Sequence, residues 1–266
     1  MSDYGKIYIG SILLEKNRWS KEKTPTLQVS DWAGRFARDG LDGIELWEYH
    51  ATLTDEGERG KLDGTPCPIA VFNSYAAMTD ADDGRRAAHA DLALRYGARG
   101  IKFNVGNDPA ARDDYLKNVM RWRDALGGRV ELLCECHPGT IIEEPAAARK
   151  FFDTAGLEGI GVIVHAFNAA DTLDEWFRHF GDKVRHAHLQ SRRGRDVVNF
   201  ADDEAAVKKA LALMTDAGFT SPDRPGGRGS FTLEFTQGTL TEQDNPDWLY
   251  AAALRDFHYL TSLLGC

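Results

Sequence analysis

The chain has 266 residues, of which 42% are hydrophobic and 27% are charged, a composition typical of a globular protein with a sizeable core. Its formal net charge of −9 argues against nucleic acid or a membrane surface as the default partner, because both attract proteins with a surplus of lysine and arginine. The first residues show no basic segment followed by an apolar one, and no apolar run approaches the ~20 residues that span a bilayer. We therefore expect a cytoplasmic protein.

The four cysteines, Cys67, Cys134, Cys136 and Cys266, do not form a disulfide framework for a chain of this size. Cys134 and Cys136 lie too close together on one predicted strand to bridge easily. No CxxC pair indicates a structural zinc site. The cysteines are expected to be buried or half-buried thiols in a reducing compartment.

Short apolar or β-branched runs alternate with longer helical stretches along the chain. The predicted strands cover residues 6–14, 43–47, 69–73, 100–105, 130–135, 159–165, 184–189 and 230–235. The predicted helices cover residues 29–39, 82–96, 108–126, 144–155, 170–180, 202–217 and 247–264. Two long loops, residues 15–27 and 191–200, follow the first and seventh strands.

The alternation of strands and helices indicates a parallel sheet, and eight such units indicate a closed (β/α)8 TIM barrel that forms a single domain over residues 1–266. An open, doubly wound sheet is the alternative. Such a sheet would normally carry a glycine-rich phosphate loop after its first strand, and Gly10-Ser11-Ile12-Leu13 is not one. In a barrel, both long loops would lie on the catalytic face.

Seven consecutive predicted strands end in a carboxylate, an imidazole or an amide. These residues are Glu45, Asn73, Asn104, Glu135, His165, His188 and Glu234. The C-terminal ends of barrel strands converge over one mouth, so the seven side chains are expected to lie close together.

Four of the seven form a plausible metal site: Glu135, His165, His188 and Glu234. Two carboxylates and two imidazoles suit Mn²⁺, Co²⁺, Zn²⁺ or Fe²⁺ and are too rich in nitrogen for Ca²⁺. Any one of them alone could instead satisfy a hydrogen bond in the core. Four ionisable groups crowded at one pole without a cation would be electrostatically costly, which favours the metal site.

Four short segments carry a resemblance to a known family. They are residues 43–46 (GIEL), 135–139 (ECHPG), 186–189 (HAHL) and 232–235 (TLEF). In this order they resemble motifs on strands two, five, seven and eight of the sugar phosphate isomerase/epimerase superfamily, the xylose isomerase-like TIM barrels. The set extends over nearly the whole chain. Each motif alone is weak, and the ordered set is fairly specific.

One departure from that family stands at the end of the sixth strand. Relatives usually place a ligand aspartate there, whereas this chain has His165-Ala166-Phe167-Asn168. We expect His165 to replace the aspartate, which makes the ligand set less negative by one charge. If His165 turns away, Asn168 or a water would complete the coordination.

The resemblance implies one bound divalent ion, with Mn²⁺ favoured over Co²⁺, Zn²⁺, Fe²⁺ or Mg²⁺. In the family the ion stabilises an enediolate formed from a ketose, and the two ligand glutamates, here Glu135 and Glu234, also move the proton. His137 is expected to bind a substrate oxygen or to cap its loop. Glu45 is expected to orient a substrate hydroxyl or His137, or to be a buried structural acid.

Three further residues are candidates for substrate binding. Arg193 resembles an arginine that relatives carry shortly after the strand-seven histidine, although Arg192 competes for this role and both could form a solvated charge run. Trp19, in the first long loop, could stack on a sugar face or simply pack. Asn104 ends the fourth predicted strand and would face the same mouth.

The resulting hypothesis is a metal-dependent isomerase or epimerase of a ketose or keto-sugar derivative, acting on a small-molecule sugar. A lyase or dehydratase that eliminates a leaving group from a keto-sugar or 3-keto-glycoside is the alternative. A nuclease is disfavoured, because its three-metal cluster needs histidines where this chain has Asn73 and Asn104. A non-enzymatic sugar- or protein-binding barrel stays open. The apolar last helix could support a homo-oligomer or pack against the barrel.

Overall fold

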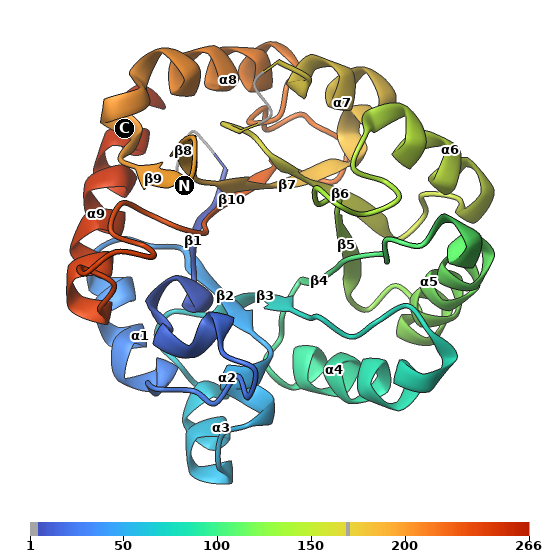
Figure 1. Cartoon of the computed structure of the whole chain (residues 1–266), viewed down its shortest axis with the longest axis horizontal. Helices are drawn as coiled ribbons and strands as arrows, with labels where there is room; N and C mark the ends of the chain where they lie inside the picture. The colour runs from blue at the N-terminus through green and yellow to red at the C-terminus, as the bar shows by residue number, and fades with distance from the viewer. Residues whose placement is uncertain (1–4, 169–170, 266) are drawn as a thin grey trace.

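Eight parallel strands close into a barrel with helices around it, as the view into the barrel in Figure 1 shows. The computed structural model describes residues 5–168 and 171–265. Around the barrel the order is β1-β10-β7-β6-β5-β4-β3-β2. Each barrel strand therefore pairs with the barrel strands before and after it in the sequence, and β10 closes the barrel by pairing with β1. The predicted single-domain (β/α)8 barrel is confirmed, and the doubly wound alternative is wrong.

The barrel strands are β1 (Ile7–Gly10), β2 (Gly43–Trp47), β3 (Ile69–Asn73), β4 (Gly100–Phe103), β5 (Glu131–Glu135), β6 (Ile160–His165), β7 (Val184–Leu189) and β10 (Ser230–Leu233). The α-helices are α1 (Val29–Arg38), α2 (Tyr49–Thr52), α3 (Glu56–Leu62), α4 (Asp83–Arg95), α5 (Arg112–Leu126), α6 (Pro145–Ala155), α7 (Leu173–Phe180), α8 (Glu204–Asp216) and α9 (Pro246–Leu263). Short 3-10 segments are η1 (Ser11–Leu14), η2 (Lys16–Trp19), η3 (Asp80–Asp82), η4 (Pro109–Ala111), η5 (Gly181–Lys183) and η6 (Phe200–Asp203).

The first strand is shorter than its apolar sequence predicts. It ends at Gly10, and the next four residues form η1 instead of extending the sheet. The Ser11 hydroxyl accepts the backbone N–H of Trp47 at 2.9 Å and bonds His50 Nδ1 at 2.9 Å. The Ser11 hydroxyl thus accepts the Trp47 N–H of β2, for which a longer β1 would supply a backbone carbonyl.

The segment between β2 and β3 contains two helices that the sequence analysis did not predict, α2 and α3. Their residues lack a clear apolar period, which is the signal used for the other helices. A capping signal is nevertheless present, because the Asp55 carboxylate accepts the backbone N–H of Glu58 at 2.8 Å. Asp55 and Glu58 have the three-residue spacing of a capping box, so this signal could have revealed α3.

The predicted loop over residues 191–200 is a β-hairpin. Its strands β8 (Ser191–Arg193) and β9 (Asp196–Val198) pair antiparallel. Gly194, with φ of 64°, allows the tight turn between them. The hairpin rises beside the barrel mouth, on the side of α8 and α9 in Figure 1.

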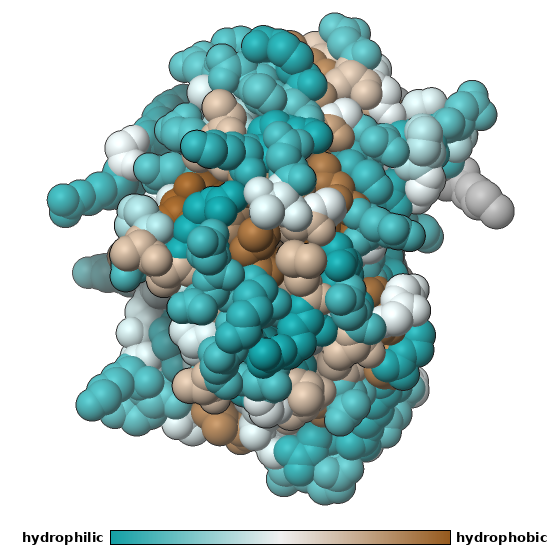
Figure 2. All heavy atoms as spheres, turned by 90° about the vertical axis from the view of Figure 1, so that its right-hand side faces the viewer, coloured by the Kyte–Doolittle hydropathy of each residue, from teal (hydrophilic) through white to brown (hydrophobic). Residues whose placement is uncertain are grey.

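Apolar side chains fill the barrel interior below the mouth and the layer between strands and helices. Tyr8, Val71, Leu133 and Ile163 form the inner cluster. The apolar residues of α9, including Leu249, belong to the main core, so that helix packs against the barrel. The outward faces are polar. On the side of the molecule shown in Figure 2, hydrophilic side chains predominate and hydrophobic ones occupy only small areas.

Cys67, Cys134 and Cys136 are buried free thiols. Cys266 and the predicted first residue of the 170–180 helix, Ala170, lie outside the described residues. Within those residues, none of the helices combines the length and apolarity that crossing a bilayer requires.

Candidate metal centre

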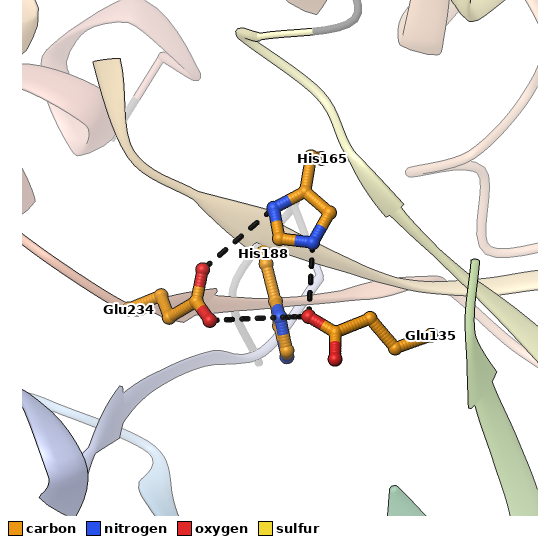
Figure 3. A group of neighbouring side chains, drawn as sticks. All are labelled: Glu135, His165, His188 and Glu234. Atoms are coloured by element: carbon orange, nitrogen blue, oxygen red, sulfur yellow. Dashed lines mark hydrogen bonds and ion pairs between the residues drawn. The ribbon is translucent and has the colours of Figure 1, made fainter. Parts of the chain in front are cut away.

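The four predicted ligands converge at the C-terminal mouth of the barrel, as Figure 3 shows. They come from β5, β6 and β7 and from the residue directly after β10, which are consecutive strands in the barrel. The register pairs His165 with His188 and therefore sets the two imidazoles side by side. One ligand atom from each of the four side chains lies within 4.8 Å of the others.

The two carboxylates approach the two imidazoles from opposite sides (Figure 3). Oε1 of Glu135 lies 2.9 Å from His165 Nε2 and 3.1 Å from His188 Nδ1. The Glu234 oxygens lie 3.6 Å from His188 Nδ1 and 3.7 Å from His165 Nδ1. His165 thus faces the cluster, as predicted, and is not turned away.

Glu45 fixes the orientation of the His188 ring through the nitrogen that does not face the ligand carboxylates. Its Oε2 lies 3.1 Å from His188 Nε2, while His188 Nδ1 faces the ligand carboxylates. A carboxylate that accepts the Nε2–H fixes the tautomer, so the Nδ1 lone pair points to the candidate metal position. The expectation that Glu45 orients His137 is wrong. Glu45 is 1% exposed and bonds His188 instead, because its strand places it deep in the barrel.

A buried polar layer supports Glu45 in turn. Asn73 Nδ2 donates to Glu45 Oε1 at 2.8 Å, and His186 Nε2 lies 3.3 Å from Oε2. Burial opposes ionisation of Glu45, but His188 and His186 hold its pKa well below the usual range. Burial also lowers the pKa of His186 to about 4, so this ring is neutral at pH 7.

Glu135 is anchored by a buried cation that the sequence analysis did not single out. Lys102 Nζ lies 2.6 Å from Glu135 Oε2, and both side chains are at most 2% exposed. Asn104 Nδ2 donates to the same oxygen at 2.8 Å, and its Oδ1 accepts from Lys102. Burial opposes ionisation of Glu135, but Lys102, His165 and His188 hold its pKa well below the usual range.

Among the described residues, Glu234 has fewer hydrogen-bond and ion-pair partners than Glu135. Gln190 Nε2 donates to Glu234 Oε2 at 2.9 Å, and Gln190 Oε1 accepts from Arg192 Nε at 3.0 Å. A neutral amide therefore links Glu234 to an arginine on the hairpin. No lysine or arginine ion pair to Glu234 is present within the part of the chain that the structure describes.

The donor set and its charge fit a bound cation. Among the described residues, Glu45, Glu135 and Glu234 are buried carboxylates, and Lys102 is the one lysine that forms an ion pair with any of them. Burial disfavours the charged form of His188, yet Glu45 and Glu234 hold its pKa well above the usual value. The carboxylates around His188 thus favour positive charge at this position, and a divalent ion on the same nitrogen and oxygen atoms would supply that charge.

Two predicted substrate residues line cavities at the mouth. Trp19, 55% exposed on η2, borders a cavity of 390 Å³, and its ring lies 5.8 Å from that of Phe235. His137 borders this cavity and a second one of 680 Å³. His137 Nδ1 lies 2.6 Å from the Pro138 carbonyl oxygen, which can only accept, so Nε2 is the acceptor nitrogen of a neutral ring.

The two candidate arginines face different surroundings. Arg193 donates to the backbone carbonyl of Asp202 and does not border either cavity among the described residues. Arg192 borders the larger cavity. Asn168 borders that cavity too, and is not among the four clustered ligands. Asn104 borders the smaller cavity in addition to bonding Glu135.

Lys102 and Gln190 are the neighbours of the site that sequence reasoning missed. A signal existed for each. A lysine inside the otherwise apolar strand β4 needs a buried partner, and its two-residue offset from Asn104 puts both on the same face. Gln190 has the same offset from His188 at the end of β7. The identity of their partners depends on neighbouring strands.

Comparison with solved structures identifies the type of barrel. No family model and no curated protein matches the chain. A xylose isomerase-like TIM barrel protein from Mycobacterium smegmatis, in complex with magnesium, superposes with a TM-score of 0.66, 16% identity and coverage of 99% of this chain and 98% of that one. The fold is the xylose isomerase-like TIM barrel. The resemblance drawn from the sequence motifs is confirmed at this level.

Other structures with this xylose isomerase-like barrel have different activities. The probable 3-DHS dehydratase AsbF from Bacillus anthracis matches with a TM-score of 0.70, 14% identity and coverage of 96% of this chain and 98% of that one. The D-psicose 3-epimerase from Clostridium cellulolyticum H10, solved with D-tagatose, matches with a TM-score of 0.68, 13% identity and coverage of 98% and 100%. An endonuclease IV from Thermus thermophilus shares the fold as well, with a TM-score of 0.63, 13% identity and coverage of 97% and 99%. The chemistry must therefore be argued from the side chains.

Proposed function

We propose that this protein is a divalent-metal-dependent isomerase or epimerase of a ketose or keto-sugar derivative, and that Glu135, His165, His188 and Glu234 hold the ion. The observation that carries the proposal is the convergence of these four side chains, with ligand atoms within 4.8 Å of one another. Mn²⁺ is the favoured ion, since two carboxylates and two imidazoles suit it. When bound, the ion supplies Lewis-acid stabilisation of the negative charge that develops on substrate oxygens.

The two glutamates lie on opposite sides of the histidine pair, an arrangement that supports proton transfer on two faces of a substrate carbon. Among the described residues, Glu234 has one close side-chain hydrogen bond, from Gln190, so we assign it the removal of the proton next to the carbonyl. Glu135 lies across the histidine pair and is fixed by Lys102. In epimerisation it returns a proton to the opposite face.

Residues around the smaller cavity would orient the sugar. Trp19 and Phe235 offer aromatic faces for stacking on the C–H side of a ring. His137 Nε2 can accept a hydrogen bond from a substrate hydroxyl. Asn104, already bonded to Glu135, forms part of the same wall.

A lyase or dehydratase is the second candidate, and the larger cavity favours it. This space borders His165, whereas Trp19 and Phe235 border the smaller cavity, and it could hold a group leaving from the neighbouring carbon. Both reactions begin with the same proton removal by Glu234. They differ in whether the proton returns or a C–O bond breaks.

The test follows the proton and the product together. Protein reconstituted with Mn²⁺ would be incubated in D₂O with ketohexoses and with a methyl 3-keto-glucoside. We expect deuterium at the carbon next to the carbonyl, detected by proton NMR, in the metal-loaded protein only. A new diastereomer indicates epimerisation, whereas the ultraviolet band of an enone indicates elimination. Absence of exchange with every keto-sugar, in protein that carries metal, would refute the proposal.

Two controls address the remaining alternatives. Metal analysis of the purified protein should find about one ion per chain, whereas a non-enzymatic barrel without a metal site would hold close to none. An assay on DNA with abasic sites should show no cleavage, since we propose a small-molecule substrate and no nucleic-acid partner. A cytoplasmic location and a homo-oligomeric state stay predictions of the sequence.

A further inference from the structure

The ligand cluster lies between two cavities of different chemistry. The smaller, of 390 Å³, borders Glu135 and Glu234 and has the aromatic side chains Trp19, Tyr75 and Phe235 in its wall. Ligand pockets in proteins measure about 300–1,000 Å³, so this cavity alone is large enough for a small ligand. A single sugar ring in this cavity would have both the two glutamates and an aromatic stacking surface beside it.

The larger cavity extends the site beyond His165. It measures 680 Å³, and His137 borders both cavities, so the two adjoin at the mouth of the barrel. Its wall combines polar side chains, among them Asn168, Gln190 and Arg192, with apolar ones such as Phe167. A free ketose in the smaller cavity would leave this space to water.

The charges around the larger cavity are balanced. Asp171 accepts a hydrogen bond from Lys209 Nζ at 3.0 Å, and Asp203 accepts one from the Ser191 hydroxyl. Two carboxylates and two cations, Lys209 and Arg192, therefore share one wall. A phosphate or carboxylate group would meet repulsion from the two aspartates as well as attraction from the two cations, so the balanced wall gives an anion no net advantage. A neutral group with many hydroxyls would find both donors and acceptors.

Arg192 can donate hydrogen bonds to a neutral, hydroxyl-rich group in the larger cavity. Its Nε donates to Gln190 Oε1 at 3.0 Å, and among the described residues the structure gives its terminal amino groups no partner. Gln190 in turn donates to Glu234 at 2.9 Å. The wall of the larger cavity is thus connected, through one amide, to the carboxylate assigned to proton removal.

We propose that the substrate consists of two sugar units. The reacting keto-sugar ring would lie in the smaller cavity, and a second, neutral, hydroxyl-rich ring would lie in the larger one against Arg192. The substrate class is then a keto-glycoside with two sugar units, and neither a free monosaccharide nor a sugar phosphate. This inference rests on the proposed function, because it needs the cluster to be the reacting centre.

Three substrates separate the possibilities in Mn²⁺-loaded protein: the 3-keto derivative of a disaccharide, methyl 3-keto-glucoside and 3-keto-glucose 6-phosphate. We expect kcat/KM for the disaccharide derivative to exceed the other two by about tenfold or more, because only its second ring gains contacts in the larger cavity. A preference for the methyl glycoside or the phosphate ester, or equal rates for all three, would overturn the inference.

A variant tests whether Arg192 reads the second ring. Arg192→Ala should lower the ratio of kcat/KM for the disaccharide derivative to kcat/KM for the methyl glycoside by about tenfold, because only the disaccharide derivative has a second ring for Arg192 to bind. Arg195→Ala, an exposed residue on the same hairpin, is the matched control and should leave this ratio unchanged. An equal loss for both substrates in Arg192→Ala would contradict the proposed subsite.

The two proposals fail in different ways. Turnover of the methyl glycoside without any advantage for the disaccharide derivative overturns the two-unit substrate and leaves the proposed function standing. Absence of turnover and of deuterium exchange with all three substrates, in protein shown to carry metal, removes the proposed function and this inference with it.

Discussion

The two carboxylates that face the histidine pair are built into the barrel differently. Glu135 is fixed on one oxygen by Lys102 and Asn104, both from β4 or the residue after it. Glu234 has one amide partner, Gln190, which connects it to a hairpin on the surface. This difference indicates different roles for the two carboxylates. Glu135, which has one oxygen fixed, would hold the metal ion, and Glu234, which has fewer partners, would move the proton.

Neutral amides in place of the two glutamates give the largest effects. Glu234→Gln should lower kcat by about 10²–10⁴-fold, the usual contribution of a general base, while a substantial part of the bound metal is retained. Glu135→Gln should lose the metal first, because the bonds to Oε2 hold the other oxygen, Oε1, against the two histidines. Metal analysis and deuterium exchange on both variants check this. Equal loss of metal from the Glu234→Gln and Glu135→Gln variants would show that the two carboxylates contribute equally to metal binding.

The buried ion pair on the Glu135 side can be tested by stability. Lys102→Met leaves Glu135 as an uncompensated buried carboxylate, and we expect a loss of about 3–5 kcal/mol in the free energy of unfolding without metal. Added Mn²⁺ should recover part of the loss. Urea unfolding with chelator and with Mn²⁺ measures both values. Lys208→Met, at an exposed pair with Glu204, is the control and should leave the free energy of unfolding nearly unchanged.

The segment that carries Trp19 depends on another buried acid, Glu15, and this gives a pH test. Glu15 accepts the backbone N–H groups of Asn17 and Thr26 and contacts His50, beneath the segment that carries Trp19. Burial opposes ionisation, yet these bonds lower the pKa of Glu15 to about 2. A carboxyl with a lowered folded-state pKa stabilises the fold fully above its unfolded value, near 4.5, and progressively less as the pH falls towards 2.

The expected size of this contribution is about 3 kcal/mol, at 1.36 kcal/mol per pKa unit. The difference in unfolding free energy between the wild-type protein and Glu15→Gln should therefore shrink as the pH is lowered from about 5 to about 2. Glu22→Gln, at an exposed position of the same loop, is the control and should show no such trend. A difference that does not change with pH would mean that the bonds of Glu15 do not favour its charged form.

The smallest effect is expected at the amide on the Glu234 side. Gln190→Leu removes the donor to Glu234, and a hydrogen bond to a charged group contributes about 1.5–3 kcal/mol, so kcat should fall by roughly ten- to a hundredfold. The metal content should stay unchanged, because Gln190 is not one of the clustered ligands. If Gln190→Leu protein loses its metal, the amide supports the ion and not the base.

Much of this architecture could be predicted from the sequence. The eight strands and the seven longer helices appear where apolar periodicity placed them, because that signal is local and strong. The exceptions are local as well: Ser11 ends β1 early, α3 begins at a capping aspartate, and a glycine turn makes a hairpin of residues 191–198. Each of these depends on a side-chain bond or a turn conformation that periodicity does not register.

The residues at the ends of the strands follow from the sequence as well, because parallel strands of a barrel deliver their C-terminal residues to one mouth. Which atoms meet there was decided only by the tertiary structure. Barrel closure and strand register bring Lys102 to Glu135, Glu45 to His188 and Gln190 to Glu234, over separations that range from 33 to 143 residues in the chain. These pairings fix the charge and orientation of each ligand, and no local pattern in the chain encodes them.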